Sequence, residues 1–370
     1  MESLPISLRR PDIILLISTL LLVIIGTVMV YSSSAIIAMD RFHDGQFFLK
    51  RQLFFVLLGL GAMFLFMRIP YQTLRYLAYP ALILSFILLL LLFVPVLGKK
   101  VGGAVRWLNM GFIAFQVGEM VKVSLVLFLA FFLSRKRHLV KEFFRGVMVP
   151  LTITAFLMGL IILQPDFGTT AIIAVTTIVM LYLGGARILH LSSLLAIFAP
   201  FAIWALCYGY RWERLMTFLN PWADPRGAGF QIIQSMISFG AGGIFGVGLG
   251  DGMQKLFYLP EPHTDFILAV IAEEGGFIGV SVVLALYTAL IVRGFMVSVK
   301  APDLFGMLLA AGLTLLFALQ IFINSAGVMG LIPLKGLTLP FLSYGGTSLL
   351  MSFAMVGILL SISAQEKKEA

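Results

Sequence analysis

The sequence is poor in charged residues, cysteine and histidine. Aspartate, glutamate, lysine and arginine make up 12% of its 370 residues, and it has one cysteine and four histidines. Cys207 alone cannot form a disulfide within the chain, which excludes a disulfide-stapled scaffold. The scattered histidines form no His/Cys metal motif, and no nucleotide-binding loop or nucleophile elbow occurs. We therefore expect neither a nucleotide nor an organic cofactor.

Apolar residues make up 60% of the chain and occur in long uncharged runs. A bilayer core requires about 20 such residues per helix, so these runs predict a polytopic, all-α integral membrane protein. We predict ten transmembrane helices, at Ile13–Tyr31, Gln52–Met67, Tyr76–Val96, Met120–Ser134, Val147–Leu163, Thr169–Leu183, Leu191–Tyr210, Phe266–Val292, Leu304–Ile323 and Gly345–Ser363. Near the fourth, Glu119 and Lys122 precede a short uncharged run. Either this helix is short, or its first turn carries charge into a polar cavity.

Basic residues indicate which helix ends face the cytoplasm. With the N-terminus inside, the cytoplasmic side receives Arg9, Arg10, Arg68, Arg75, Arg135, Lys136, Arg137, Lys141, Arg145, Arg187, Arg293, Lys300, Lys367 and Lys368. Cytoplasmic loops of membrane proteins carry such an excess, so both termini are predicted to be cytoplasmic and Asp265 extracytoplasmic. The net charge of +9 is explained by anchoring against anionic lipid and requires no nucleic acid.

The chain is predicted to be a single membrane domain, 1–370, that contains one long polar segment. Residues 211–264 would form an extracytoplasmic loop between the seventh and eighth helices, with nine glycines from Gly227 to Gly252. Ordered loops of this length are uncommon and usually functional. Within the loop, Phe230–Ile237 predicts a short amphipathic helix lying along the membrane.

Four extracytoplasmic clusters carry side chains capable of chemistry. They are Lys99–Leu108 with Phe115–Lys122, then Gln164–Thr170, Leu259–Glu274 and Lys335–Ser348. Ionisable residues are costly to bury in a membrane, so such clusters are functional candidates. The candidate substrate-binding residues are Arg106, Glu119, Lys122, Gln164, Asp166, Arg211, His263, Lys335 and Ser343.

Two of these clusters also have an ordinary structural interpretation. Glu119 and Lys122 are three residues apart on one helical face, so they can simply pair with each other. Asp166 precedes a predicted helix, where aspartate often caps the free backbone N–H groups. Taken alone, Asp166 is better explained as a cap than as a binding residue.

The segment around the eighth helix has an ordinary interpretation as well. Thr264 or Asp265 at the helix start would act as an N-cap. Glu273 and Glu274 would lie about 12–14 Å deeper than Asp265, at a rise of 1.5 Å per residue. At least one of them would then be a buried, hydrogen-bonded structural residue.

Together the clusters resemble the SEDS family (shape, elongation, division and sporulation) of bacterial peptidoglycan polymerases. The resemblance covers essentially the whole chain, and its most specific blocks are Gln164–Thr169, Gly246–Leu256, Leu259–Glu274 and Lys335–Ser348. Gln254–Pro260 and Lys335–Pro340 look most like the FtsW cell-division branch or its sporulation relatives. One departure is Phe115–Glu119, where the family usually has Pro-Ser before the glutamate.

The resemblance implies a glycosyltransferase that polymerises lipid II into glycan strands. It would act at the outer face of the bacterial cytoplasmic membrane, at the division septum. The family's essential aspartate corresponds to Asp265, which would remove the proton from the acceptor sugar hydroxyl. A carboxylate beside apolar surface can have a raised pKa, which would make it a better base.

The resemblance also implies that positive charge stabilises the departing lipid diphosphate. Arg106, Lys122 and Arg211 are the candidates, alone or with Mg²⁺ or Mn²⁺. If a divalent cation binds, Asp265, Glu119 or Asp166 would hold it, because Mg²⁺ usually needs only one or two protein carboxylates.

The implied partners are lipid II, a polyprenyl-pyrophosphate-linked glycan, a class B penicillin-binding transpeptidase and other division proteins. Two other functions stay open at this point. A lipid II flippase would need a continuous polar path across the membrane, for which Glu273 and Glu274 are the only obvious deep carboxylates. A non-catalytic division scaffold would tolerate alanine at Asp265.

Overall fold

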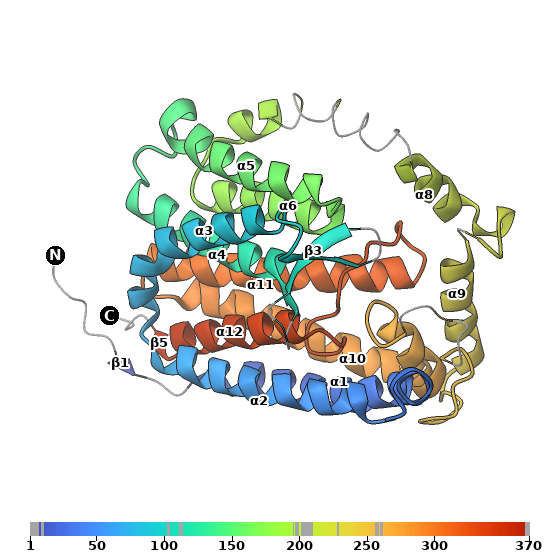
Figure 1. Cartoon of the computed structure of the whole chain (residues 1–370). Helices are drawn as coiled ribbons and strands as arrows, with labels where there is room; N and C mark the ends of the chain where they lie inside the picture. The colour runs from blue at the N-terminus through green and yellow to red at the C-terminus, as the bar shows by residue number, and fades with distance from the viewer. Residues whose placement is uncertain are drawn as a thin grey trace.

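The protein is a bundle of long helices with a few short strands (Figure 1). The computed structural model describes residues 7–8, 11–101, 104–109, 111, 114–194, 196, 200, 210–227, 229–255, 259 and 262–366. The elements are β1 (Ser7–Leu8), α1 (Ile13–Phe42), α2 (Phe47–Arg68), η1 (Tyr71–Thr73), α3 (Leu74–Leu91), β2 (Gly98–Val101), β3 (Ala104–Asn109), β4 (Ala114–Gln116), α4 (Val117–Arg135), η2 (Phe143–Met148), α5 (Val149–Leu163), α6 (Phe167–Leu183), α8 (Tyr210–Leu219), η3 (Pro221–Ala223), α9 (Phe230–Gly242), α10 (Ile267–Lys300), α11 (Leu304–Val328), α12 (Gly346–Ser363) and β5 (Gln365–Glu366).

Nine of the ten predicted transmembrane helices are helices within the described residues. Eight are long and apolar enough to cross a membrane, and α6 is a shorter apolar helix. The predicted seventh span, Leu191–Tyr210, lies largely outside the described residues. The prediction of a polytopic helical membrane protein is confirmed.

Several helices extend beyond their predicted bounds, and in α1 and α4 the added turns carry polar residues inside the bundle. α1 continues past Tyr31 to Phe42, and the hydroxyls of Ser33 and Ser34 donate to carbonyls one turn back. Such bonds satisfy a hydroxyl within its own helix. α4 already begins at Val117, so it is full-length and its first turns carry charge inside. Of the two predicted alternatives for the fourth span, the short helix is therefore excluded and the charged first turn applies.

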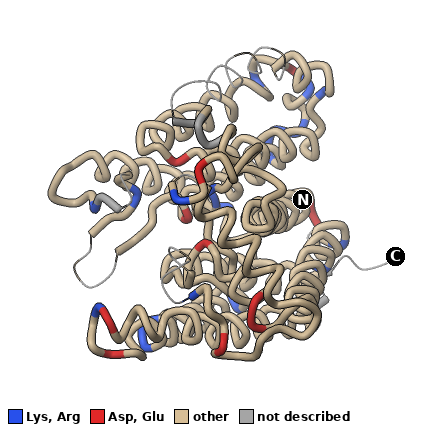
Figure 2. Tube along the Cα trace, turned by 90° about the vertical axis from the view of Figure 1, so that its right-hand side faces the viewer, with Lys and Arg blue, Asp and Glu red and all other residues tan. Residues whose placement is uncertain are grey.

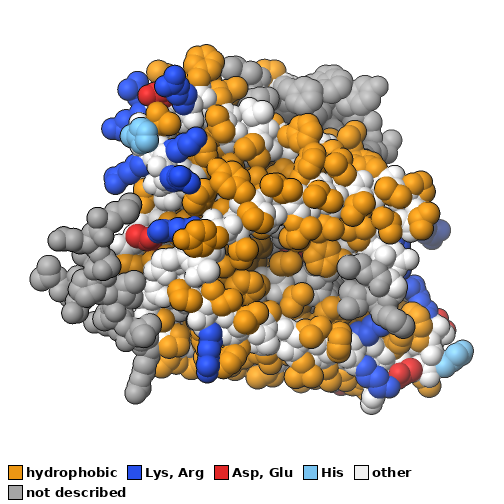
Figure 3. Space-filling model, turned by 60° about the vertical axis from the view of Figure 1, so that its left-hand side comes forward, with side chains coloured by type: hydrophobic (Ala, Val, Ile, Leu, Met, Phe, Trp, Pro, Cys, Tyr) orange, Lys and Arg blue, Asp and Glu red, His pale blue; other side chains and the backbone are white. Residues whose placement is uncertain are grey.

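The apolar helices differ in how much of their surface other helices cover. α4, α11 and α12 lie in the middle and are mostly buried, whereas α2, α3 and α5 expose large apolar side chains such as Leu57, Ile83 and Phe156. Apolar side chains cover the body of the molecule, and most charged side chains lie toward its two ends (Figure 3). This surface suits hydrocarbon rather than water.

Two small sheets lie at opposite ends of the bundle. β2, β3 and β4 form an antiparallel sheet that contacts the beginnings of α4 and α12. β1 pairs with β5, which joins the two chain termini next to the start of α1. The first sheet was not predicted from the sequence, and it carries Arg106 to the edge of the helices.

α10 is broken at Gly276, whose φ of 62° and ψ of −161° are not helical. A Cβ at Gly276 would collide with the backbone nitrogen of Gly246, so the close approach requires glycine. Val247 belongs to residues 211–264, the predicted extracytoplasmic loop, which is called the outer loop below. Its N–H donates to the Glu273 carbonyl at 3.0 Å, in place of a donor from the next turn of α10. At the break, residues 243–248 of the outer loop are therefore hydrogen-bonded to α10.

The break also places Glu273 and Glu274 at the rim of the bundle. Glu274 accepts a hydrogen bond from Ser32 at 2.7 Å, and Ser32 lies about 30 Å along α1 from its start. The Asp265 carbonyl accepts one from Asn324 at 3.0 Å, and Asn324 lies about 30 Å along α11 from its start. Because α1 and α11 start at the same end, Glu274 and Asp265 lie at similar heights. The predicted greater depth of the two glutamates is wrong.

Candidate active site

Asp265 lies where the third and fourth clusters meet. Asn324 of α11 donates its side-chain amide to the Asp265 carbonyl at 3.0 Å and to the Leu337 carbonyl at 2.5 Å. The half-buried carboxylate approaches Gly336, where an added Cβ would lie 3.2 Å from Oδ2. One amide thus fixes the backbone that carries Asp265 against the chain that faces it.

The prediction that Thr264 or Asp265 caps the eighth helix is wrong. α10 begins at Ile267, Phe266 occupies the N-cap position, and no side chain caps the helix. The Asp265 carboxylate lies beside Gly336.

The fourth cluster is held against the third by hydrogen bonds to backbone carbonyls. Ser343 donates its hydroxyl to the Thr264 carbonyl at 2.5 Å and accepts the Leu339 N–H at 2.8 Å. The Tyr344 N–H donates to the His263 carbonyl at 2.8 Å. Ser343, a predicted substrate-binding residue, thus shapes the loop that faces Asp265.

The first cluster centres on the predicted Glu119–Lys122 pair. The Lys122 amino group donates to Glu119 Oε1 at 2.8 Å and to Gln320 Oε1 at 2.7 Å. Glu119 and Lys122 are only 4% and 3% exposed, so the pairing offsets the cost of burying both charges. Gln320 in turn donates to the Thr338 carbonyl at 2.9 Å, which connects this pair to the fourth cluster.

In the second cluster, Asp166 is the predicted helix cap and also an ion-pair partner. Its carboxylate accepts the Thr169 N–H at 3.1 Å and the Thr169 hydroxyl at 2.9 Å. Arg106 Nε lies 3.9 Å from Asp166 Oδ2, and the same guanidinium donates to the Pro165 carbonyl at 2.5 Å. Gly118 lies next to Asp166 and Thr169, so this cluster adjoins the start of α4.

All four predicted clusters therefore lie at one end of the bundle. Figure 2, seen from that end, shows acidic and basic segments close together within the helices. Gln320 and Asn324 connect three of the clusters, and the sequence analysis missed both. Their spacing of four residues, which places two amides on one face of an apolar helix, was the available signal.

His263 is buried beneath two aromatic rings. Its ring lies 4.5 Å from that of Phe48 and 5.7 Å from that of Tyr344, and the residue is 6% exposed. Burial, with a smaller effect from Arg41, lowers the pKa of His263 to about 4. The imidazole is therefore neutral at pH 7 and supplies no positive charge to a bound diphosphate.

The other predicted binding residues lie in three different parts of the structure. Gln164 is buried and its amide lies 3.5 Å from the Leu89 carbonyl, beside the second cluster. Lys335 is half-buried, one residue before the glycine that faces Asp265. Arg211 belongs to α8, but its side chain lies outside the described residues.

A second buried ion pair lies at the rim, between the outer loop and α10. Lys255 donates to Glu274 Oε1 at 2.6 Å and to Ser32 of α1 at 3.0 Å. Glu273 accepts the backbone N–H groups of Met253 and Gln254 at 2.7 and 3.1 Å. Both glutamates are thus buried and hydrogen-bonded, as predicted for at least one of them, and they anchor the end of the outer loop.

The described residues contain no group of three or more His, Cys, Asp or Glu side chains able to hold a metal ion. Glu119 and Asp166 each already face a cationic side chain, at 2.8 and 3.9 Å. A divalent metal ion would therefore have to be held mainly by substrate phosphates, with one protein carboxylate beside them.

Comparison with known sequences identifies the group to which this architecture belongs. The FtsW/RodA/SpoVE family model, described as cell cycle protein, matches residues 12–368. The chain is 45% identical to the "Probable peptidoglycan glycosyltransferase FtsW" of Trichlorobacter lovleyi, over 97% of this chain and 95% of that protein. It is also 45% identical to the stage V sporulation protein E of Bacillus subtilis, over 95% of this chain and 97% of that protein.

Solved structures with the same fold span nearly the whole chain. One, from a study of how a peptidoglycan synthase complex coordinates polymerization and crosslinking, matches with a TM-score of 0.78 and 32% identity, over 95% of this chain and 97% of the other. The rod shape determining protein RodA of Thermus thermophilus matches with a TM-score of 0.72 and 27% identity, over 97% and 98%. The resemblance inferred from the four clusters is confirmed.

Proposed function

The chain belongs to the FtsW/RodA/SpoVE family, and from this premise we propose that it is a peptidoglycan glycosyltransferase that polymerises lipid II. The observation that carries the proposal is the convergence of the four polar clusters around Asp265. The four polar clusters of this multi-pass membrane protein gather at one end of the bundle. This arrangement suits a substrate whose sugars lie outside the bilayer and whose lipid lies within it.

Asp265 is the general base in this proposal. The acceptor sugar hydroxyl gives its proton to the Asp265 carboxylate while its oxygen attacks the anomeric carbon of the donor. The bond from that carbon to the diphosphate oxygen breaks, and the polyprenyl diphosphate leaves. Asn324 positions the Asp265 backbone for this step, because it holds the Asp265 and Leu337 carbonyls together.

Arg106 is better placed than Lys122 to contact the diphosphate. Its side chain is 28% exposed, whereas that of Lys122 is 2% exposed and already bound to Glu119 and Gln320. A guanidinium presents paired N–H donors that match phosphate oxygens. We therefore assign Arg106 to the leaving group and Lys122 to the organisation of the site.

A divalent cation, Mg²⁺ or Mn²⁺, is part of the proposal. When bound, it neutralises negative charge on the diphosphate. The substrate phosphates and the Asp265 carboxylate would hold this cation. Polymerisation should fall when the metal is chelated and recover when either ion is added back.

The decisive experiment is polymerisation of purified lipid II by the full-length protein in detergent. Asp265→Asn keeps the shape of the side chain and removes the base, so the rate should fall about 100- to 10,000-fold. Asp251→Asn is the matched control, because Asp251 is an exposed aspartate of the same outer loop. A normal rate for Asp265→Asn would contradict the base assignment, whereas no polymerisation by the wild type would leave the scaffold alternative standing.

The structure weakens the flippase alternative. That function rested on Glu273 and Glu274 as deep carboxylates, and both lie at the rim with hydrogen-bond partners from the outer loop. Neither glutamate therefore extends a polar path toward the opposite end of the bundle.

The proposal includes a partner and an orientation. We propose a class B penicillin-binding transpeptidase as partner at the division septum, supported by the structural relative from a peptidoglycan synthase complex. Both termini would be cytoplasmic, as the basic residues at one end of the bundle indicate. In a Cys207→Ser background, an impermeant maleimide added outside intact cells should label Asp251→Cys and spare Lys136→Cys.

A further inference from the structure

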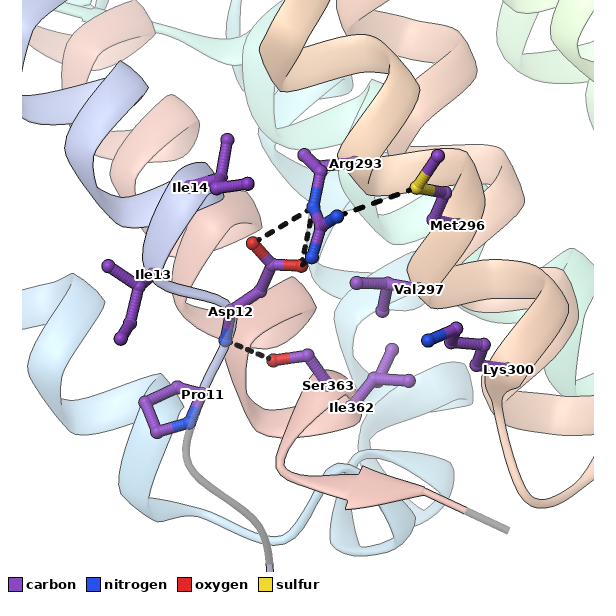
Figure 4. A pocket seen from close by; sticks show the side chains of 10 residues that line it. All are labelled: Pro11, Asp12, Ile13, Ile14, Arg293, Met296, Val297, Lys300, Ile362 and Ser363. Atoms are coloured by element: carbon purple, nitrogen blue, oxygen red, sulfur yellow. Dashed lines mark hydrogen bonds and ion pairs between the residues drawn. The ribbon is translucent and has the colours of Figure 1, made fainter. Parts of the chain in front are cut away.

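A cavity of about 400 Å³ lies at the end of the bundle opposite Asp265 (Figure 4). Its walls come from the start of α1, the last two turns of α10 and the end of α12. The glycosyl transfer proposed above uses none of these residues, and neither do the four polar clusters.

The polar wall of the cavity carries two basic side chains, Arg293 and Lys300, and one acidic side chain, Asp12, among the described residues that line it. Arg293 donates through Nε and Nη2 to both carboxylate oxygens of Asp12, at 2.6–3.2 Å. Lys300 extends from α10 two turns further on (Figure 4). The third guanidinium nitrogen of Arg293, Nη1, donates to the sulfur of Met296 at 3.6 Å.

The mouth of the cavity is apolar and faces outward. Ile13, Ile14 and Met296 are 56%, 50% and 43% exposed. They belong to helices that cross the membrane, so this exposed surface lies against lipid. The cavity thus joins a cationic wall at the end of the spans to an apolar wall alongside them.

We propose that this cavity binds the headgroup of an anionic phospholipid of the cytoplasmic leaflet. The phosphate would lie at Arg293 and Lys300, and the acyl chains would follow Ile14 and Met296. Basic pockets between transmembrane helices on the cytoplasmic side are suited to such headgroups. A zwitterionic headgroup would bring an ammonium group toward these two basic side chains, so it binds less well. The proposal relies on the cytoplasmic orientation of this end and is independent of the glycosyltransferase chemistry.

Native mass spectrometry of the full-length protein tests this directly. The detergent-solubilised protein is mixed with equal amounts of phosphatidylglycerol and phosphatidylcholine, and the lipid retained by each variant is counted. The wild type should retain phosphatidylglycerol preferentially. Lys300→Gln should lower that preference about fivefold, the effect of one basic residue near an anionic surface, and Lys300→Arg should preserve it.

Two further variants complete a charge series. Asp12→Asn keeps a side chain able to cap α1 but removes the negative charge, so it should raise the preference for phosphatidylglycerol. Arg137→Gln, an exposed residue at the same end and outside the cavity, should change nothing. Equal retention of the two lipids by the wild type would overturn the proposal. So would a preference that ignores the charges of Lys300 and Asp12, or one that Arg137→Gln lowers as much as Lys300→Gln does.

Discussion

The two buried lysine–glutamate pairs of this protein are assembled in different ways. Glu119 and Lys122 lie one turn apart on α4, and Gln320 is the only residue outside that helix, within the described part of the chain, that hydrogen-bonds the Lys122 amino group. Lys255 and Glu274 are nineteen positions apart, and they join the outer loop, α10 and α1 through Ser32. The first pair depends on a single helix, whereas the second depends on three segments meeting.

The difference indicates what each pair does. The α4 pair lies within the network that reaches the Thr338 loop and the neighbourhood of Asp265, so it organises the site. The rim pair holds Lys255 of the outer loop against α10 and α1, so it stabilises the fold around the site. Four substitutions test this distinction.

Lys122→Met should have the largest effect. It leaves the Glu119 carboxylate buried without its cation, which costs about 3–5 kcal/mol. It should also lower lipid II polymerisation about 100-fold, because a shift of about 1 Å in a positioned group has that effect. Rates and unfolding midpoints in detergent measure both. The double variant Glu119→Gln/Lys122→Met should regain stability but not activity, and recovery of both would show that the pair is only structural.

Lys255→Met should cost a similar free energy of unfolding, about 3–5 kcal/mol, because the Glu274 side chain is fully buried. Its effect on polymerisation should stay below tenfold, and protease cleavage of the outer loop should increase. Limited proteolysis and the lipid II assay distinguish the outcomes. A loss of activity as large as that of Lys122→Met, without added proteolysis, would erase the distinction between the pairs.

His263 sharpens the comparison, because it is a third buried ionisable residue and burial lowers its pKa. Its pKa is about 4 in the folded protein and about 6.5 when unfolded. The unfolded chain therefore gains a proton first, and stability should fall as pH drops from about 6.5 to about 4, by on the order of 3 kcal/mol. His263→Gln should flatten this decline in the unfolding midpoint. The exposed His43→Gln serves as control and should leave the slope unchanged.

Ser32→Ala should have the smallest effect. It removes one hydroxyl from the rim pair and leaves the ion pair intact, so stability should fall by about 1 kcal/mol. Thermal unfolding measures this loss. A loss as large as that of Lys255→Met would mean that α1, rather than the ion pair, anchors the loop.

Much of the fold and part of the site could be predicted from local sequence. The apolar runs predicted nine helices that the structure contains. Helical spacing predicted the Glu119–Lys122 pair, and position before a helix predicted the Asp166 cap. These features involve residues within one turn of each other, whose distances follow from the geometry of a single helix.

The errors concern features that depend on other parts of the chain. Asp265 does not cap α10, because the chain around it is held by Asn324 and the Ser343 loop. Glu274 is not deep, because residues 243–248 of the outer loop replace the helical donors at Gly276. No local pattern near either residue encodes these contacts.

The sequence by itself determined that this protein is a helical membrane protein with four polar clusters predicted to lie on one side. Hydrophobicity and loop charge act residue by residue, so they can be read without a structure. The tertiary structure decided which polar groups meet. It used Gln320 and Asn324 to connect three clusters, and it paired Lys255 with Glu274. Only helix packing determines such contacts, because the partners are distant in sequence and a buried polar group must be satisfied by whichever partner packing brings near.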